Sequence, residues 1–317
     1  MKRLFLILVA AIVAGVIPTS AQNRNSSGAA LVTLNAIAVS EAGFQASSQT
    51  YMRDKLMQII MQNGLGSADY NSRFVLTAGV VPVTKDFVAG PPRQVSQTLD
   101  YTFYIVDNYD QKVFATSIIT VKVVEASEEK AFLRSIRSIN AKDARLVSFV
   151  KEGREKIVAY YNAQIDRIIS KARLCAKTKD FEQAFFELAA VPEACGEAFD
   201  KAVAAAGEIF SEYVNFAGER LLAKAKAAWA AQQNADGAAL AGQYLSEIYP
   251  EAACYPQAET LYKEIKAKVL ADWKFEMKIY QDGVDLEKQR IDAWRQVGIA
   301  YGEHQQPTSN NIAWLFK

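Results

Sequence analysis

Hydrophobic and polar positions follow two different rhythms along the chain, and the rhythm changes near residue 140. Before that point, strand-like runs of alternating or β-branched residues occupy 30–39, 74–83, 95–106 and 112–124. Residues 47–62 instead carry apolar side chains at helical spacing, and Asn63-Gly64 supplies a stop. The order strand, helix, three strands, helix predicts a sheet of about four strands with two helices on one face.

Turn residues mark the borders of these elements. Gly90-Pro91-Pro92 suits neither a helix nor a central strand, so we expect a loop there. Asp107-Asn108-Tyr109-Asp110 separates two strand-like runs and predicts an antiparallel hairpin. Ser127, followed by Glu128 and Glu129, has the character of an N-cap with acidic residues in the first turn. A helix is therefore expected to begin there.

After residue 141 the apolar residues recur at spacings of three and four, which predicts helices only. The expected spans are about 143–178, 180–191, 196–232, 237–249 and 256–300. Ile168–Arg173 matches Leu221–Lys226 at an offset of about 53, and a Pro-Glu corner follows in both copies, at Pro192 and Pro250. Each copy is a long helix, a short return helix and a corner. Such units must stack on their neighbours.

The first residues have the layout of a secretory signal. Lys2 and Arg3 precede the apolar run Leu4–Ile17, and Thr19-Ser20-Ala21 supplies a small-residue cleavage site. The run is shorter than the roughly 20 apolar residues of a membrane-spanning helix. We therefore expect an exported protein that is periplasmic or associated with the outer membrane, with no transmembrane segment after signal removal.

These patterns together predict an α+β protein in which a small mixed α/β domain precedes an all-α stack of long and short helices. The expected divisions are a signal peptide at 1–21, a flexible leader at 22–29, the α/β domain at 30–140, the helical repeat domain at 141–301 and a polar tail with an apolar end at 302–317.

Charge removes one class of function. The 317 residues include 36 basic and 35 acidic side chains, a net charge of +1 that becomes −1 once Lys2 and Arg3 are removed with the signal. Residues 22–140 carry 11 basic and 10 acidic groups, and residues 141–317 carry 23 and 25. Neither half has the basic excess typical of a nucleic-acid binder, so we expect no nucleic-acid partner.

Candidate chemistry is sparse. The single histidine, His304, lies in a polar stretch without cysteine or carboxylate ligands at metal-binding spacing. We expect no catalytic residue, no metal and no cofactor. If the short helices descend and the long helices rise, Cys175 lies level with about residue 204 of the next long helix, and Cys254 lies opposite about residue 220. At a rise of 1.5 Å per residue, both levels are too far along the helix axis from Cys195 for a disulfide. This predicts no intramolecular disulfide, and a buried apolar role fits Cys175 best.

Two apolar features are candidates for interaction. The last helix carries a strong apolar stripe that includes Trp294, which suits packing within the chain, a partner groove or a dimer seam. The tail ends in an apolar peptide with Trp314, Leu315 and Phe316. It either docks on the chain itself or is a short adhesive motif for an envelope partner. These four residues are the candidate partner-binding residues.

Three resemblances add to this picture. Asp180-Phe181-Glu182-Gln183-Ala184 through Leu188, ending at a proline corner, resembles the second helix of tetratricopeptide-type (TPR) repeats, which implies protein binding or scaffolding. Phe74-Val75-Leu76, the turn from Asp107 to Lys112 and Val121–Ala131 resemble the small α/β domains of periplasmic assembly proteins, namely the amino-terminal domain of TolB, flagellar assembly protein T and the curli secretion lipoprotein. The whole chain is also similar in style to exported proteins of Bacteroidota.

The sequence thus favours an exported, non-enzymatic scaffold or assembly adaptor of the cell envelope, which binds an envelope protein through helix faces or the open edge of the sheet. One alternative is a periplasmic hydrolase or carbohydrate-binding protein with a cleft between the two domains. A second alternative is a structural subunit of a secreted or phage-related assembly. The oligomeric state and the partner's identity stay open.

Overall fold

A computed structural model describes residues 32–39, 42–43, 46–65, 73–269, 276–277, 286–304 and 309–316. The expected signal peptide at 1–21 and leader at 22–29 lie outside these ranges. The fold is α+β, as predicted: a four-stranded sheet is followed by a helical carboxy-terminal part.

The sheet follows chain order, β1-β2-β3-β4. Its strands are β1 (Leu34–Ala36), β2 (Phe74–Val88), β3 (Gln94–Asp107) and β4 (Lys112–Glu125). β1 runs parallel to β2, which requires the crossover helix α1 (Ala46–Gln62), and the other two pairings are antiparallel. Within 32–39, the described part of the strand predicted at 30–39, only three residues form a strand, because only that stretch pairs with β2.

Three helices, one more than predicted, contact one face of the sheet. Tyr101 and Ile105 alternate onto the same face of β3. The Tyr101 hydroxyl lies 2.5 Å from Ser135 Oγ on α2 (Glu128–Ser138), whose N-cap is Ser127, as predicted. Ile105 meets α3 (Ala144–Lys177) at Gly153, where a Cβ would clash with it. α1 joins them through contacts with α2, β1 and β2.

A helical part follows, and its first four helices alternate between long and short. Its elements are α3, α4 (Phe181–Ala189), a 3₁₀ turn (Glu193–Cys195), α5 (Glu197–Ala231), α6 (Ala235–Ser246), α7 (Tyr255–Val269) and α8 (Leu286–His304), with a final 3₁₀ segment, η3 (Ser309–Phe316). The long and short helices up to α6 match the predicted spans within three residues. Asp180 caps α4 by accepting from the Gln183 N–H at 3.3 Å, and Asn234 caps α6.

The long helices are staggered along their axes, as the predicted helix lengths imply. Cys195, just before α5, lies 4.0 Å from the Val158 carbonyl of α3. Cys254 Sγ would lie 3.0 Å from a Cβ placed on Gly218 of α5, close to the predicted level. All three cysteines are free. The expectation for Cys175 is wrong, however, because Cys175 is half-buried whereas Cys195 and Cys254 are buried.

The predicted single helix at 256–300 is also wrong. α7 ends at Val269, Glu276 and Met277 are not helical, and α8 folds back onto α4 and α5. The close approach depends on glycine: a Cβ on Gly298 would lie 2.9 Å from the Phe185 backbone of α4, and one on Gly302 would lie 2.9 Å from the Phe186 ring. The described part of the stripe on this helix, which includes Trp294, therefore packs within the chain.

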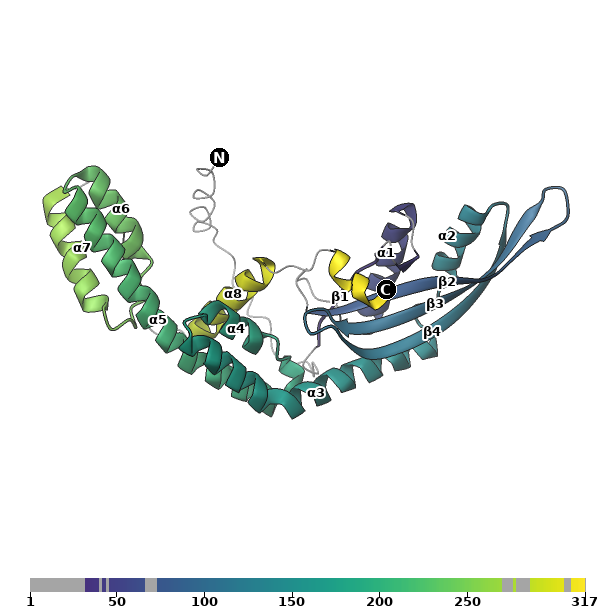
Figure 1. Ribbon diagram of the computed structural model, residues 1–317, viewed down its shortest axis with the longest axis horizontal. Helices are drawn as coiled ribbons and strands as arrows, with labels where there is room; N and C mark the ends of the chain where they lie inside the picture. Colours follow the sequence, from purple (N-terminus) through teal and green to yellow (C-terminus); the bar gives the residue numbers. More distant parts are fainter. Residues whose placement is uncertain are drawn as a thin grey trace.

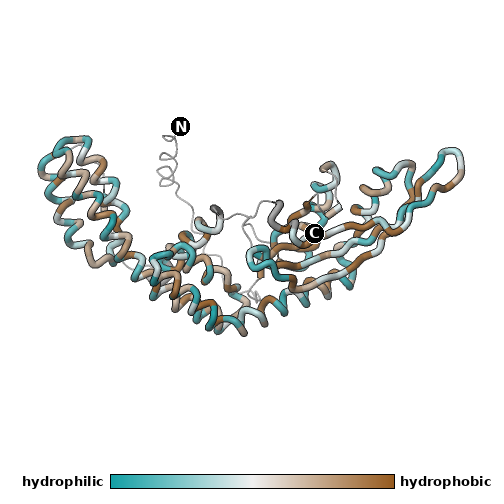
Figure 2. The backbone as a smooth tube through the Cα atoms, viewed as in Figure 1, coloured by the Kyte–Doolittle hydropathy of each residue, from teal (hydrophilic) through white to brown (hydrophobic). Residues whose placement is uncertain are grey.

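The chain forms an elongated arc (Figure 1). α3 lies along the sheet and extends beyond it to α5, so the sheet and the α5–α7 bundle occupy opposite ends. Hydrophobic and hydrophilic residues alternate along strands and helices (Figure 2). None of the helices in the described ranges is both long enough and apolar enough to cross a membrane.

Candidate interaction sites

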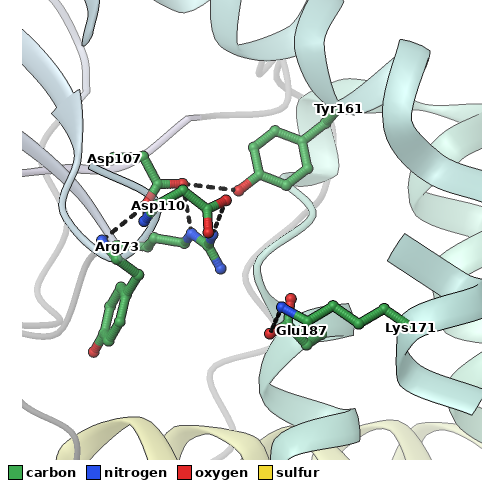
Figure 3. Close-up of polar contacts among 7 residues, drawn as sticks. Arg73, Asp107, Asp110, Tyr161, Lys171 and Glu187 are labelled. Atoms are coloured by element: carbon green, nitrogen blue, oxygen red, sulfur yellow. Dashed lines mark hydrogen bonds and ion pairs between the residues drawn. The ribbon is translucent and has the colours of Figure 1, made fainter. Parts of the chain in front are cut away.

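A polar cluster, buried except at Asp110, joins the sheet to α3 (Figure 3). Arg73 precedes β2, Asp107 ends β3, and Tyr161 lies on α3. Arg73 Nε donates to Asp107 Oδ2 at 2.6 Å, and its Nη2 donates to Asp110 at 2.5 Å. The Tyr161 hydroxyl donates to the same Asp107 oxygen at 3.3 Å. We call Arg73, Asp107, Asp110 and Tyr161 the junction clamp.

Each of the two carboxylate oxygens of Asp107 accepts two hydrogen bonds. Its second oxygen, Oδ1, accepts from the backbone N–H groups of Tyr109 at 2.9 Å and Asp110 at 3.0 Å, which shapes the β3–β4 turn. The Asp107 side chain is 0% exposed and that of Arg73 is 10% exposed. A buried carboxylate with four donors is a structural group, because its charge is fully compensated.

The electrostatics of the clamp follow from burial. Burial opposes the charge of Arg73, but the nearby oxygens of Tyr161, Asp107 and Asp110 outweigh it and hold the Arg73 pKa above its ordinary value. Burial also raises the pKa of Tyr161 well above its ordinary value, so its hydroxyl keeps its proton and remains a donor. Arg73 therefore stays charged and Tyr161 stays protonated at physiological pH.

The space beside the clamp is small. A cavity of about 40 Å³ lies between Arg73, Tyr161, Arg167 and Lys171. Lys171 is paired with Glu187 of α4 at 2.7 Å. Small-molecule sites usually have volumes of about 300 Å³ or more, so this junction has the dimensions of a packed contact.

A larger cleft lies where the first helical unit meets the second. Its volume is about 540 Å³, and its walls come from the α3–α4 turn, α5 and Glu247, which follows α6. We call it the corner cleft. Three aromatic residues, Phe181, Tyr213 and Phe216, line it. Phe181 lies 5.5 Å from Phe216 and 5.7 Å from Tyr213, ring centre to ring centre, so the rings form one cluster.

Cations surround these rings. Lys179 Nζ lies 5.6 Å from the centre of the Phe216 ring, and the Arg220 guanidinium lies 5.4 Å from it. Lys224 completes the basic side of the cleft, and within the described part of the chain none of these three cations forms an ion pair. Asp180, Glu182 and Glu247 line the same cleft, so its charges are mixed.

The four candidate partner-binding residues separate into two groups. Trp294 is 1% exposed and its ring centre lies 6.2 Å from that of Phe185, so it packs inside the chain and offers no surface to a partner. Trp314, Leu315 and Phe316 are half-buried in η3. The Phe316 ring meets Tyr104 of β3 at 5.9 Å, edge to face, so the tail docks on the sheet of its own chain.

Metal chemistry has no visible site in the described ranges, where no group of three histidine, cysteine or carboxylate side chains is arranged to hold an ion. His304 ends α8, and its side chain lies outside what the structure describes. Sequence reasoning missed Arg73 and the corner cleft. The turn at Asp107 and the helix break at Lys179 were visible signals, but their partners are distant in sequence.

Comparison with known proteins adds little. No protein-family model matches the chain, and no curated protein matches it either. One similar solved structure is the crystal structure of a minor lipoprotein from Acinetobacter baumannii, which is 17% identical over 33% of this chain and 83% of its own, with a TM-score of 0.24. A likeness at that level supports no conclusion about fold or function.

Proposed function

We propose that this protein is an exported, non-enzymatic adaptor of the cell envelope that binds a protein partner at the corner cleft. The observation that carries the proposal is the aromatic cluster of Phe181, Tyr213 and Phe216, flanked by Lys179 and Arg220 in an open cleft of about 540 Å³. Tyrosine, phenylalanine and arginine are enriched in the cores of protein interfaces. Mixed charges on the rim suit partner selection better than bulk electrostatic attraction.

The shape of the chain supports the same proposal. An elongated arc with a sheet at one end and helices at the other presents two separated surfaces, as an adaptor requires (Figure 1). The hydrolase alternative needs a cleft between the two halves. At that junction the clamp carboxylate of Asp107 is fully hydrogen-bonded and the cavity is about 40 Å³, so no observation favours the alternative.

Export is part of the proposal. Fractionation of the native host should place the mature protein outside the inner membrane, and amino-terminal sequencing should begin at Gln22. Recovery of the chain with Met1 intact from the cytoplasm would contradict this part.

The binding test is crosslinking and affinity capture of the mature protein from native envelopes. We expect a partner that depends on the cleft: Phe216→Ala and Lys224→Glu should each reduce capture at least about tenfold, as loss of an interface hot spot does. Lys142→Glu is the matched control, since it makes the same charge change at an exposed site outside the cleft. Equal loss with the control, or turnover of a small substrate without any captured partner, would refute the adaptor.

A further inference from the structure

The sheet has a second face, opposite α1, α2 and α3, and the chain's own carboxy-terminal segment lies on it. Val75, Thr77 and Gly79 alternate onto this face of β2, and Thr77 is paired with Tyr104 of β3 in the register. η3 returns from the helical half to this part of the sheet, where Figure 1 shows it in yellow beside the strands. The face is thus covered by residues more than 200 positions later in the sequence.

Phe316 occupies a slot that a glycine creates. A Cβ on Gly79 would lie 2.7 Å from Cε1 of the Phe316 ring, closer than real Cβ atoms approach. Tyr104 forms the wall of the slot, with its ring at 81° to that of Phe316. Ile312, one turn earlier, is 0% exposed. The groove is therefore shaped to take an aromatic side chain on an apolar segment.

The tail fills this groove imperfectly. Thr77 Oγ1 lies buried in the groove without a hydrogen-bond partner, and Trp314 Nε1 of the tail is likewise buried and unpaired. An unpaired buried polar atom costs free energy because its bonds to water are lost without replacement. η3 is also eight residues long, whereas 3₁₀ runs rarely exceed about four because their hydrogen-bond geometry is poor.

We propose that this groove is a docking site for a partner segment and that residues 309–316 are its internal placeholder. The segment would be apolar, with an aromatic side chain for the Gly79 slot and a polar group that pairs with Thr77. Such a segment pairs the Thr77 hydroxyl and buries no unpaired indole. Its intrinsic affinity for the groove is therefore about tenfold or more above that of the tail. This inference rests on the proposed adaptor function and gives it a second binding surface.

A second copy of the chain is a poorer occupant. Its tail would leave the same Thr77 hydroxyl unpaired and would bury the same Trp314 nitrogen, so it gains nothing over the resident tail. Tethering of the resident tail disfavours every separate occupant equally, so only better pairing in the groove distinguishes a partner from a second copy. The complementary chemistry therefore points to a different polypeptide.

The groove is tested with the mature chain and a labelled nonapeptide that has the sequence of residues 309–317. Phe316→Ala weakens the resident tail, so the peptide should bind this variant at least about tenfold more tightly than the unaltered chain, as measured by fluorescence anisotropy. A peptide in which alanine replaces its phenylalanine should lose most of that affinity. A nonbinding peptide, with the variant folded by circular dichroism, would overturn the proposal.

A matched pair of glycine substitutions locates the site. In the Phe316→Ala chain, Gly79→Ala places a Cβ in the slot and should abolish peptide binding, whereas Gly207→Ala on α5 meets nothing within 4 Å and should leave binding unchanged. Equal effects of the two substitutions would overturn the proposal. So would dimers of the unaltered chain that exchange their tails.

A second measurement covers the case in which Phe316→Ala fails to fold. Peptide added to the unaltered chain at millimolar concentration, comparable to the effective concentration of the tethered tail, should displace part of the tail and accelerate hydrogen exchange of the amides at 312–316. No acceleration at this concentration would overturn the proposal. These results are independent of envelope capture at the corner cleft, so the groove and the adaptor function can fail separately.

Discussion

The junction clamp and the tail both connect distant parts of the chain, but they do so with opposite chemistry. In the clamp, the Asp107 carboxylate accepts from two side chains and two backbone N–H groups. In the tail, Phe316 and Ile312 make apolar contacts while Trp314 Nε1 stays unpaired. Opening the clamp would leave buried charges without hydrogen-bond partners, which costs much free energy. Lifting the partly exposed, apolar tail breaks no such charge network. The comparison indicates one permanent joint and one exchangeable joint.

The largest effect should come from breaking the clamp. Asp107→Ala leaves the Arg73 charge, only 10% exposed, without its main partner and removes the acceptor for the turn. We expect a loss of about 3–5 kcal/mol in the free energy of unfolding, measured with urea. Asp110→Ala is the control, because that carboxylate is 45% exposed and should matter by about 1 kcal/mol or less. Equal losses of unfolding free energy in the two variants would mean that Asp107 is not what holds the sheet to α3.

A pH titration tests the sheet side of the molecule. Burial raises the pKa of Tyr101 to about 12 from 10.0, although the Ser135 hydrogen bond counters part of the rise. Between these values the unfolded chain releases the proton while the folded chain keeps it, so the stability that this group provides is complete below pH 10 and falls as pH rises toward 12. The loss should reach up to about 3 kcal/mol.

Tyr101→Phe is the matched control for this titration. The variant loses the hydrogen bond to Ser135 at all pH values, but its stability should fall less steeply above pH 10. Parallel stability profiles for the two chains in thermal melts would contradict the assignment.

Packing of α8 offers a third, smaller test. Gly298→Ala places a Cβ 2.9 Å from the Phe185 backbone and should destabilise the chain by about 1–3 kcal/mol, because backbone cannot yield as a side chain does. Gly207→Ala should instead stabilise it by up to about 1 kcal/mol, since the added methyl has open space and favours the helix. Thermal unfolding of both variants checks the sign; stabilisation by Gly298→Ala would show that α8 does not pack this closely.

The smallest expected change in stability comes from a substitution in the groove beneath the tail. Thr77→Val removes a buried hydroxyl that has no partner and should be neutral or stabilising by about 1 kcal/mol. Thr120→Val, at an exposed threonine that donates to Asp100 at 2.6 Å, should be slightly destabilising. Urea unfolding of the two variants distinguishes them, and a clear loss with Thr77→Val would show that the hydroxyl is satisfied.

The local elements were predictable from the sequence, whereas their long-range contacts were not. The alternation around Asp107–Asp110 predicts the hairpin, and Ser127 predicts the start of α2, because both signals lie within a few residues of what they specify. The stagger that brings Cys254 to Gly218 also follows, since it depends only on helix lengths.

Long-range partners need information that periodicity does not contain. Nothing near Arg73 identifies Asp107 as its partner, because the two are joined only when β2 pairs with β3. The apolar stripe of the last helix predicts burial of Trp294 but not the fold-back onto α4. Gly298 and Gly302, spaced four apart, were the available signal for a close helix contact, but they do not identify the partner helix.

Native-state hydrogen exchange tests the contrast between the two joints most directly. The amides of Tyr109 and Asp110 donate to Asp107, so they report opening of the clamp, and the amides of residues 312–316 report opening of the tail. We expect the tail amides to exchange at least about 100-fold faster, a difference of about 2.7 kcal/mol in opening free energy. Exchange of both sets at one rate, that of global unfolding, would contradict an exchangeable tail.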